Sequence, residues 1–337
     1  MKSAVVTAIA TSVAILAMSP ASVRAQSSDL FFKGKTVTVY DSSPAGSGYD
    51  LYARLFARHI GRHLPGTPNV IVSNVPGAGG IVCANLVYNT AAKDGTALGL
   101  IRQTIAEEQA LQTDGVRFDV VKFNWIGRIA SNVEITYVWH TVPIKTIDDL
   151  KTRETVFSTT GGSMPLFAQL LNTMIGTRFK LVMGYKGTPE ADLALERGEV
   201  EGGTSSVNIM ETTHKDWMTN ELITILVQYA LERHPFLPQV PAVVELAKTS
   251  EDRSLLEFLA SASAVGLSIL APPGVPADRL AELRAAFDAT MIDPEFLADI
   301  QHLGADFSPL PAEQVKKIIA STINVSATVR ARAQALR

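Results

Sequence analysis

Short strand-like segments alternate with helix-like segments along the first third of the chain. β-Branched residues alternate over residues 35–40, and apolar residues recur at helical spacing over 51–64. A second strand is expected over 69–73, a second helix over 81–90 and a third strand over 97–101. Because strands that alternate with helices are typical of parallel sheets covered by helices, the sequence predicts an α/β fold.

The same alternation returns later in the chain, which indicates a second unit built around a sheet. Strands are expected at residues 155–157 and 180–183, and a helix follows each of them. With 337 residues, the chain is long enough for two domains that each bury their own core. Crossovers are expected near residues 139–142 and 226–231, so the predicted lobes are 26–138 together with 230–337, and 139–229.

Three loops rich in glycine and serine each lie between a predicted strand and a predicted helix, at residues 41–50, 74–80 and 158–163. The first N–H groups of a helix have no partners within the helix, and the helix dipole makes this end positive. Glycine lets an anion approach those N–H groups closely. The loops therefore indicate a site for a carboxylate or a phosphate, and glycines that only make tight turns are the alternative.

The first of these loops offers several donors. Gly46, Ser47, Gly48 and Tyr49 can present backbone N–H groups, and the Ser47 hydroxyl is a further donor. Tyr49 could form a wall of the pocket or only pack in the core. Asp50 has two open roles, because it could contact the ligand or cap the first turn of the following helix.

The N-terminus has the layout of a secretory signal peptide. Lys2 precedes an uncharged, mostly apolar run over residues 4–18, and Val23 and Ala25 are suited to the −3 and −1 positions of a cleavage site. The run is shorter than the about 20 apolar residues that a membrane anchor needs. We expect cleavage near Ala25, so that residues 1–25 are removed, a periplasmic mature protein and no stable membrane insertion. An uncleaved anchor is the alternative.

Charge and cysteine content exclude other classes of partner. Two of the 30 basic residues and none of the 33 acidic residues lie within residues 1–25, so the mature chain has 28 bases and a formal charge of 28 − 33 = −5. This acidic balance gives no reason to expect nucleic acid or an anionic membrane as a partner. The single cysteine, Cys83, cannot form an internal disulfide.

Other functional patterns are weak. His59 and His63 lie four residues apart on a predicted helix, but no third ligand is near them, so a solvated helix face is favoured over a metal site. Residues 77–80 (GAGG) lack the spacing of a dinucleotide-binding fingerprint. The nucleophile elbow of serine hydrolases is absent, although a spatial triad that includes Ser47 stays open. We therefore expect no catalytic residues, no metal and no cofactor.

Seven short motifs follow one another along the chain, and each is weak alone. They are residues 45–50 (AGSGYD), 74–80 (NVPGAGG), 93–96 (KDGT), 158–163 (STTGGS), 184–188 (GYKGT), 198–202 (GEVEG) and 271–276 (APPGVP). Together, and behind a signal peptide, they resemble the Bug family, the TctC-type solute receptors of tripartite tricarboxylate transporters. The resemblance covers essentially the whole mature chain.

This resemblance implies a type II periplasmic-binding-protein fold, in which a ligand cleft lies between two lobes. In the family, the loops that match residues 45–50 and 76–80 hold one carboxylate of the ligand, and the opposite lobe contributes the loop that matches 158–163. The residues that carry over as ligand contacts are Gly46, Ser47, Asp50, Ala78, Gly79, Thr160, Gly162 and Ser163, and motif position places Lys186 and Ser205 near the cleft.

The implied function is capture of a small organic acid, a mono- or dicarboxylate, for the permease subunits of a membrane transporter. A ligand that touches both lobes favours the closed form, and the closed monomer would dock on the permease. Ser47 stands where the family usually has a second glycine, and Tyr49 replaces a commonly smaller residue, so the ligand class is open. A receptor that reports to a sensor protein and a secreted hydrolase are the alternatives.

Overall fold

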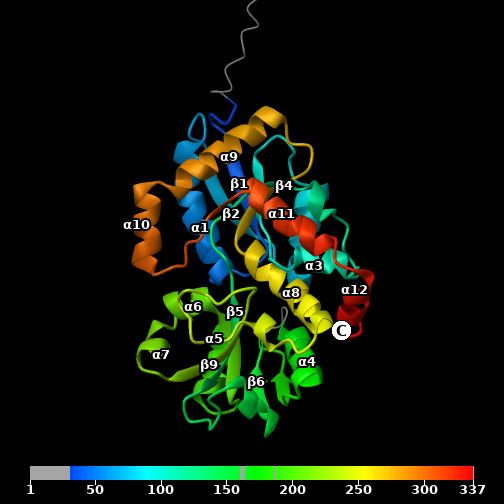
Figure 1. Cartoon of the computed structure of the whole chain (residues 1–337). Helices are drawn as coiled ribbons and strands as arrows, with labels where there is room; N and C mark the ends of the chain where they lie inside the picture. The colour runs from blue at the N-terminus through cyan, green and yellow to red at the C-terminus, as the bar shows by residue number, and fades with distance from the viewer. Residues whose placement is uncertain (1–30, 160–163, 186, 337) are drawn as a thin grey trace, which may run out of the picture.

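Two β-sheets organise the part of the chain that the computed structural model describes, which is residues 31–159, 164–185 and 187–336. The first sheet lies in the upper half of Figure 1 and the second in the lower half, and helices cover both. The predicted α/β architecture of two sheet-containing lobes is therefore confirmed. No helix in these described ranges is both long enough and apolar enough to cross a bilayer.

The first sheet has the strand order β11-β4-β10-β3-β1-β2. β1 pairs in parallel with both β2 and β3, as the alternation of strands and helices predicts, whereas β10 runs antiparallel to its neighbours β3 and β4. The strands are β1 (Thr36–Asp41), β2 (Asn69–Asn74), β3 (Ala97–Leu100), β4 (Asn124–Arg128), β10 (Ser268–Ala271) and β11 (Leu310–Pro311).

The second sheet has the strand order β7-β6-β8-β5-β9. β6 pairs in parallel with β7 and β8, and β5 runs antiparallel to β8 and β9. The strands are β5 (Glu134–Trp139), β6 (Thr155–Ser158), β7 (Phe179–Val182), β8 (Gly202–Ser206) and β9 (Ile223–Tyr229).

Helices pack on both faces of each sheet. Around the first sheet they are α1 (Gly48–Ile60), α9 (Ala277–Met291) and α10 (Pro294–Leu303) on one face, and α2 (Ile81–Asn89), α3 (Ile105–Ala110) and α11 (Ala312–Ile323) on the other. Around the second sheet they are α4 (Met164–Ile175) on one face, and α5 (Thr188–Glu196), α6 (Val207–Thr212) and α7 (Lys215–Thr219) on the other. Short 3-10 turns are η2 (Gly61–His63), η3 (Ala78–Gly80), η4 (Val120–Lys122), η5 (Ile147–Lys151) and η6 (Val243–Leu246).

The alternation in β1 explains how the first sheet seats α1. Val37 and Val39 are fully buried in the same core cluster as Leu55 and Phe56 of α1, whereas Thr38 between them is less buried. Successive side chains of a strand point to opposite faces, so one face of β1 receives α1. β1 therefore ends close to the start of α1, and the first glycine-rich loop connects the two.

The predicted crossover near residues 139–142 is wrong. β5 begins at Glu134 and pairs with β8 and β9, so it belongs to the second sheet, and the chain crosses between β4 and β5, over residues 129–133. The predicted boundary at 138 thus falls on the wrong side of β5. After β9, Val243 and Val244 share a buried cluster with Val227, so the segment up to η6 still packs on the second sheet.

Helix α8 (Ser250–Val265) joins the two halves. Its residues Leu255, Leu256 and Leu259 belong to the same buried cluster as Phe167 and Leu171 of α4. Figure 1 shows α8 between the two sheets, beside the C-terminal helix α12 (Ala327–Gln334). The halves are therefore packed together along one side by an apolar contact.

Candidate functional site

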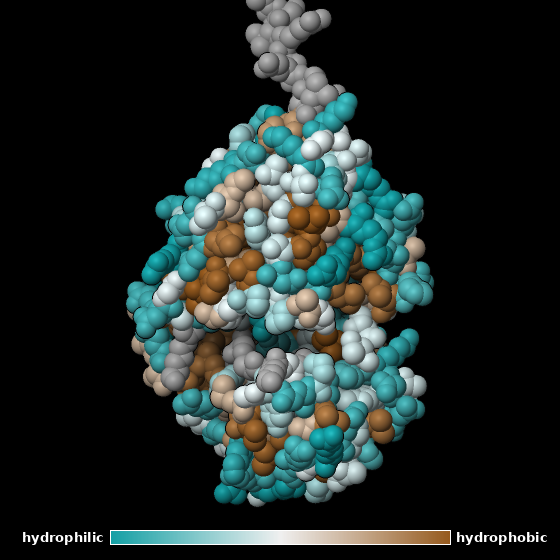
Figure 2. Space-filling view, turned by 180° about the vertical axis from the view of Figure 1, so that it is seen from behind, coloured by the Kyte–Doolittle hydropathy of each residue, from teal (hydrophilic) through white to brown (hydrophobic). Residues whose placement is uncertain are grey.

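The two sheets turn their edges toward each other. Because β1, β2 and β3 are parallel, the segments that follow them leave from one edge of the first sheet. In the second sheet β8 ends where β5 begins, since Ser206 pairs with Glu134. A Cβ atom on Gly48 would lie 3.0 Å from Cδ1 of Ile209, so α1 and α6 meet across the boundary. Figure 2 shows a hollow between the two halves on the face opposite to that in Figure 1.

Ser47 is the N-cap of α1. Its hydroxyl oxygen accepts the N–H of Asp50 at 3.3 Å and lies 2.6 Å from the hydroxyl of Ser43. The Ser43 hydroxyl in turn donates to the Asp41 carboxylate at 2.7 Å. The serine that departs from the family's usual glycine therefore directs its hydroxyl into the protein, where it stabilises the helix start.

The Asp50 carboxylate holds the first loop in shape. One oxygen accepts the N–H of Gly46 at 2.8 Å and Nε–H of Arg54 at 2.9 Å, and the other accepts from Nδ2 of Asn74 at 2.9 Å. Burial opposes ionisation, but these hydrogen bonds outweigh it and hold the pKa of Asp50 below its ordinary value. The cap of the first turn, one of the two roles left open for Asp50, belongs instead to Ser47, because α1 begins at Gly48. The contacts of the Asp50 carboxylate stabilise the loop.

Asp41, at the end of β1, lies below this loop and is fully buried. Burial raises the pKa of its carboxyl to about 6, hydrogen bonds from Ser43 and Asn74 oppose the rise, and the Asp50 charge adds to it. The folded protein therefore binds this proton more tightly than the unfolded chain, whose aspartate has a pKa of 3.8. The stability that comes from this proton is full below pH 3.8 and is lost as the pH rises through 6.

We expect the free energy of unfolding of the wild type to fall relative to that of Asp41→Asn by about 2 kcal/mol between pH 4 and pH 7, because the pKa of Asp41 rises from 3.8 in the unfolded chain to about 6 in the folded protein. Urea titrations at four pH values measure the difference. The exposed Asp114→Asn is the matched control and should follow the wild type. Parallel curves for the wild type and Asp41→Asn would contradict the assignment.

Tyr49 connects α1 to the segment after β3. Its side chain is only 5% exposed, and its hydroxyl oxygen accepts the backbone N–H of Gln103 at 3.1 Å. Burial raises the pKa of Tyr49 to about 12, and the charge of Arg102 opposes the rise. Tyr49 therefore packs in the core of the first half, beside the segment that follows β3.

The second glycine-rich loop has an unusual backbone. Gly77, Gly79 and Gly80 all have positive φ, and so does Ala78 between them, at 44°. Ala78 and Gly79 are exposed. A Cβ atom on Gly80 would lie 2.9 Å from Cβ of Arg102, so the absence of a side chain there lets Arg102 pass close to the loop.

Arg102 lies between the two loops, and the sequence did not single it out. Its backbone N–H donates to the Ser42 hydroxyl at 2.8 Å, its stem passes Gly80, and its guanidinium carbon lies 5.5 Å from the ring centroid of Tyr49. In the described part of the chain, no ion pair joins this guanidinium to a carboxylate. The side chain is only half-buried, so it is a cation that a ligand carboxylate can reach.

A cavity of about 370 Å³ opens where α1, α6 and the end of α10 meet. It brings together four of the predicted site residues, Gly46, Ser47, Gly48 and Asp50, with Ile209 and Thr213 from the second half. The first loop therefore borders a space between the halves, as the sequence predicts for a ligand-binding loop.

A family model for the tripartite tricarboxylate transporter family receptor matches residues 53–333. The match covers most of the chain, including both sheets apart from β1. The chain belongs to this receptor family. The resemblance stated from the seven motifs is thereby confirmed.

Solved structures agree with the receptor's fold. A TctC solute-binding protein from Polaromonas is 19% identical, with a TM-score of 0.62 and coverage of 89% of this chain and 97% of that one. A protein of R. palustris with adipate is 19% identical, with a TM-score of 0.67 and coverage of 88% and 97%. MatC from Rhodopseudomonas palustris, with bound malate, is 20% identical, with a TM-score of 0.63 and coverage of 89% and 98%. The predicted periplasmic-binding-protein fold is confirmed, and no curated protein matches the receptor's sequence.

The remaining predicted site residues of the receptor divide into two groups. Thr160, Gly162, Ser163 and Lys186 lie outside the described residues. Ser205 lies in β8 opposite Ile135, on the other face of the sheet from the neighbouring pair of Glu134 and Ser206. Ser205 therefore lies near the end of β8 that faces the first half, but its side chain points to the face of the sheet opposite to that of Glu134.

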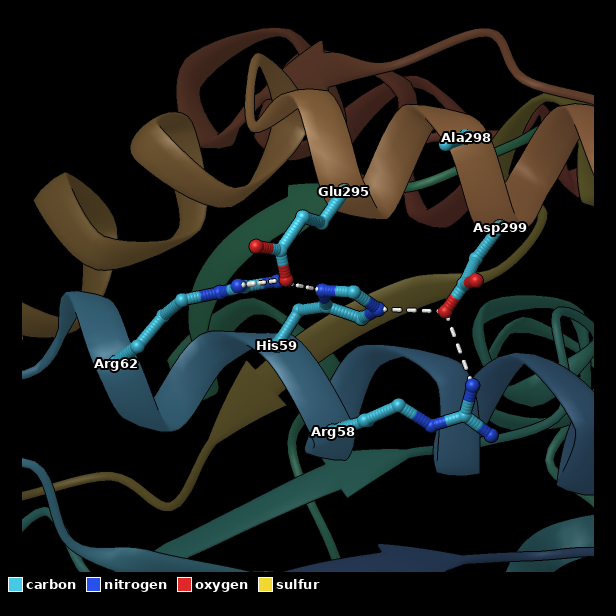
Figure 3. A pocket seen from close by; sticks show the side chains of 6 residues that line it. All are labelled: Arg58, His59, Arg62, Glu295, Ala298 and Asp299. Carbon is cyan, nitrogen blue, oxygen red and sulfur yellow. Dashed lines mark hydrogen bonds and ion pairs between the residues drawn. The ribbon is translucent and has the colours of Figure 1, made fainter.

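His59 of the receptor belongs to an ion-pair cluster between α1 and α10 (Figure 3), and His63, in η2, has an ion pair with the N-cap residue of α10. Nε2 of His59 lies 2.8 Å from Asp299, and Nε2 of His63 lies 2.6 Å from Asp293. The expectation of a solvated helix face is wrong for His59, which is 3% exposed because α10 packs over it and Phe296 contacts its ring. No group of three or more metal-ligating side chains occurs among the described residues.

Proposed function

We propose that this receptor is an exported binding protein that captures a small mono- or dicarboxylate and delivers it to the permease subunits of a tripartite tricarboxylate-type transporter. It acts as a monomer and performs no chemistry on its ligand. Residues 1–25 serve as the signal peptide, so the mature protein works in the periplasm. The two glycine-rich loops and the second lobe enclose the acid.

The observation that carries this proposal is the cation between the loops. Arg102 has no ion-pair partner among the described residues, and it lies beside the start of α1 and beside Gly80. A guanidinium presents donors that match a carboxylate in a bidentate arrangement. The N–H groups of Gly46, Ser47 and Asp50 already have acceptors within the loop, so the first-turn N–H groups of Gly48 and Tyr49 are the ones available to the same acid.

Two solved relatives support a carboxylate as the ligand. One contains malate and another contains adipate, and both are dicarboxylates. Their identity to this chain is low, so they support the class of ligand and not a particular acid. Of the two departures from the family pattern, Tyr49 bears on the choice of acid because its larger side chain fills space behind the first loop, whereas the Ser47 hydroxyl is directed into the protein.

A thermal-shift screen tests the proposal. The purified protein is heated with mono-, di- and tricarboxylates of increasing length, with the corresponding amides as uncharged controls. A ligand that binds only the folded state raises the melting temperature by mass action, and about 100 times its Kd stabilises by about 2.7 kcal/mol. Stabilisation by at least one acid and not by its amide is expected. The proposal fails if no acid shifts the melting temperature, or if an ester or amide substrate is turned over.

A further inference from the structure

An ion pair joins the two halves close to the segment where the chain crosses between them. Nε2 of His234 lies 3.7 Å from Oδ2 of Asp306, and the two side chains are 10% and 13% exposed. The same Oδ2 atom accepts the hydroxyl of Ser131 at 3.0 Å, and Ser131 lies within the crossing segment, residues 129–133. The pair is therefore largely shielded from water, so solvent weakens its attraction less than that of an exposed pair.

The two partners of this pair belong to different halves. Asp306 follows α10, its backbone oxygen accepts the Tyr52 hydroxyl of α1 at 2.7 Å, and the next residue, Phe307, packs against the core of the first sheet. His234 follows β9, and its backbone N–H donates to Oε1 of Gln228 in that strand at 2.6 Å. A movement of one half away from the other therefore breaks the contact between Asp306 and His234.

A third titratable side chain, Glu211, lies at the same boundary, near the end of α6. Its backbone oxygen would lie 3.3 Å from a Cβ atom on Gly304, so α6 contacts the loop that leads to Asp306. The carboxyl oxygen Oε2 of Glu211 is buried and has no hydrogen-bond partner among the described residues. Burial raises the pKa of Glu211 to about 7, the charge of Asp306 adds to the rise, and that of His234 opposes it. Both partners of the ion pair therefore act on the Glu211 carboxyl, which gains or loses its charge near neutral pH.

The other charged and titratable groups around the pair keep their state near neutral pH. Burial opposes the ionisation of Asp306, but the neighbouring imidazole and hydroxyl outweigh it and hold the pKa of Asp306 below its ordinary value. Burial lowers the pKa of Arg128, which faces Asp306, to about 10, and burial raises the pKa of Tyr52. Asp306 therefore stays anionic, Arg128 cationic and Tyr52 neutral. Glu211 is the carboxyl whose charge changes.

We propose that Glu211, His234 and Asp306, which we call the interlobe contact, hold the halves together while Glu211 is neutral and favour their separation when Glu211 is ionised. An ionised Glu211 places a second carboxylate in the poorly hydrated boundary beside Asp306, where like charges repel strongly. Separation of the halves returns both carboxylates to water. Because a hydrated Glu211 has its ordinary pKa of 4.5, the stabilisation is full below pH 4.5 and is lost as the pH rises through 7.

The interlobe contact also couples proton binding to ligand binding. An acid that bridges the halves favours the closed form, and so does protonation of Glu211, so each strengthens the binding of the other. The receptor would then hold its ligand more tightly at mildly acidic pH and release it more readily above pH 7. This consequence rests on the proposed function, whereas the contact between the halves does not need a ligand.

Double electron–electron resonance between spin labels tests the inference without ligand, so the outcome does not depend on the proposed function. The labels are attached to Gln301→Cys in the first half and Asp216→Cys in the second, both at exposed positions, and the buried Cys83 stays unlabelled. From pH 5.5 to pH 8.5 the ratio of the shorter to the longer distance should fall about tenfold or more, since each unit by which the pKa of Glu211 differs between the two forms changes their ratio up to tenfold. A distribution of distances that is the same at both pH values would overturn the inference.

The Glu211→Gln variant assigns the effect to one carboxyl. Glutamine matches the size of the neutral side chain, so the variant should keep the shorter distance at both pH values, with a change of about threefold or less in the ratio. Asp41, whose pKa is about 6, is present in both proteins and contributes equally to each. The exposed Glu196→Gln, in the same half, is the matched control and should respond to pH as the wild type does. An equal response in Glu211→Gln and the wild type would overturn the inference.

Calorimetry with the acid found in the thermal-shift screen tests the coupling to the ligand. From pH 5.5 to pH 8.5 the affinity of the wild type should fall about tenfold more than that of Glu211→Gln, and ionisation of the acid itself cancels in this comparison. Equal falls in the two proteins would overturn the coupling. Failure of every acid to bind would overturn the proposed function, whereas the distances between the labels would still decide whether the interlobe contact responds to protons.

Discussion

The Arg102→Gln variant is expected to bind its carboxylate ligand about a hundredfold more weakly than the wild type, because loss of one partner of a desolvated charge pair costs about 2–5 kcal/mol. Glutamine keeps the polar character of the side chain but supplies no charge and no bidentate fork. The stem can still pass Gly80, where a Cβ atom would lie only 2.9 Å from Cβ of Arg102. Isothermal titration calorimetry with the acid found in the thermal-shift screen measures the change.

The matched control is Arg117→Gln, which makes the same change at an exposed position. It should leave the affinity within about twofold, since exposed charges far from the ligand act only through a screened field. The melting temperature of Arg102→Gln without ligand should stay close to that of the wild type, because this guanidinium forms no ion pair within the described residues. Unchanged affinity in Arg102→Gln would remove the observation on which the proposed function depends.

The Gly202→Ala variant is expected to lose about 3 kcal/mol of folding free energy, at the upper end of the usual cost of overpacking a core. Gly202 lies in β8 directly opposite Phe157 of β6. A Cβ atom there would lie 2.4 Å from Cε1 of Phe157 and 2.5 Å from the backbone oxygen of Tyr137. Since Phe157 is fully buried and the Tyr137 oxygen belongs to β5, neither atom can move away without disturbing the sheet.

Urea titration measures this loss, and Gly198→Ala is the comparison within the same sequence motif. Gly198 has a φ of 72° but open space around the position of a Cβ atom. Its replacement should therefore cost only about 1 kcal/mol, from backbone conformation alone. Equal losses of folding free energy in the two variants would show that the lack of space beside Phe157 is not the reason for glycine at position 202.

Sequence reasoning predicted the parts of the fold that depend on local periodicity. The parallel strands β1, β2 and β3 and the helices α1 and α2 are close to the expected positions, because alternating and helical patterns are visible in short windows. β5 was missed because its residues are buried on both faces, so that Glu134 begins a run without clear alternation. The crossover was therefore placed after this strand instead of before it.

The candidate site was predicted only in part, for a related reason. The glycine-rich loops are recognisable from their composition, whereas Arg102 is one polar residue after the end of β3 and has no distinctive sequence pattern around it. Its importance comes from Gly80 and Tyr49, which are distant in sequence and close in space. Likewise, the role of Asp50 follows from the contacts of its carboxylate with Arg54 and Asn74, and the contact with Asn74 is not visible in the local sequence.

The hydrogen bonds among Ser43, Ser47, Asp50 and Asn74 have a consequence for selectivity. This half of the binding region has its shape before any guest arrives, so little conformational entropy is lost there on association. Every acid therefore contacts the same preformed loop in the first half. The second half must therefore discriminate between competing acids. Substitutions in β5 and α6 are the way to obtain a receptor that prefers a different acid.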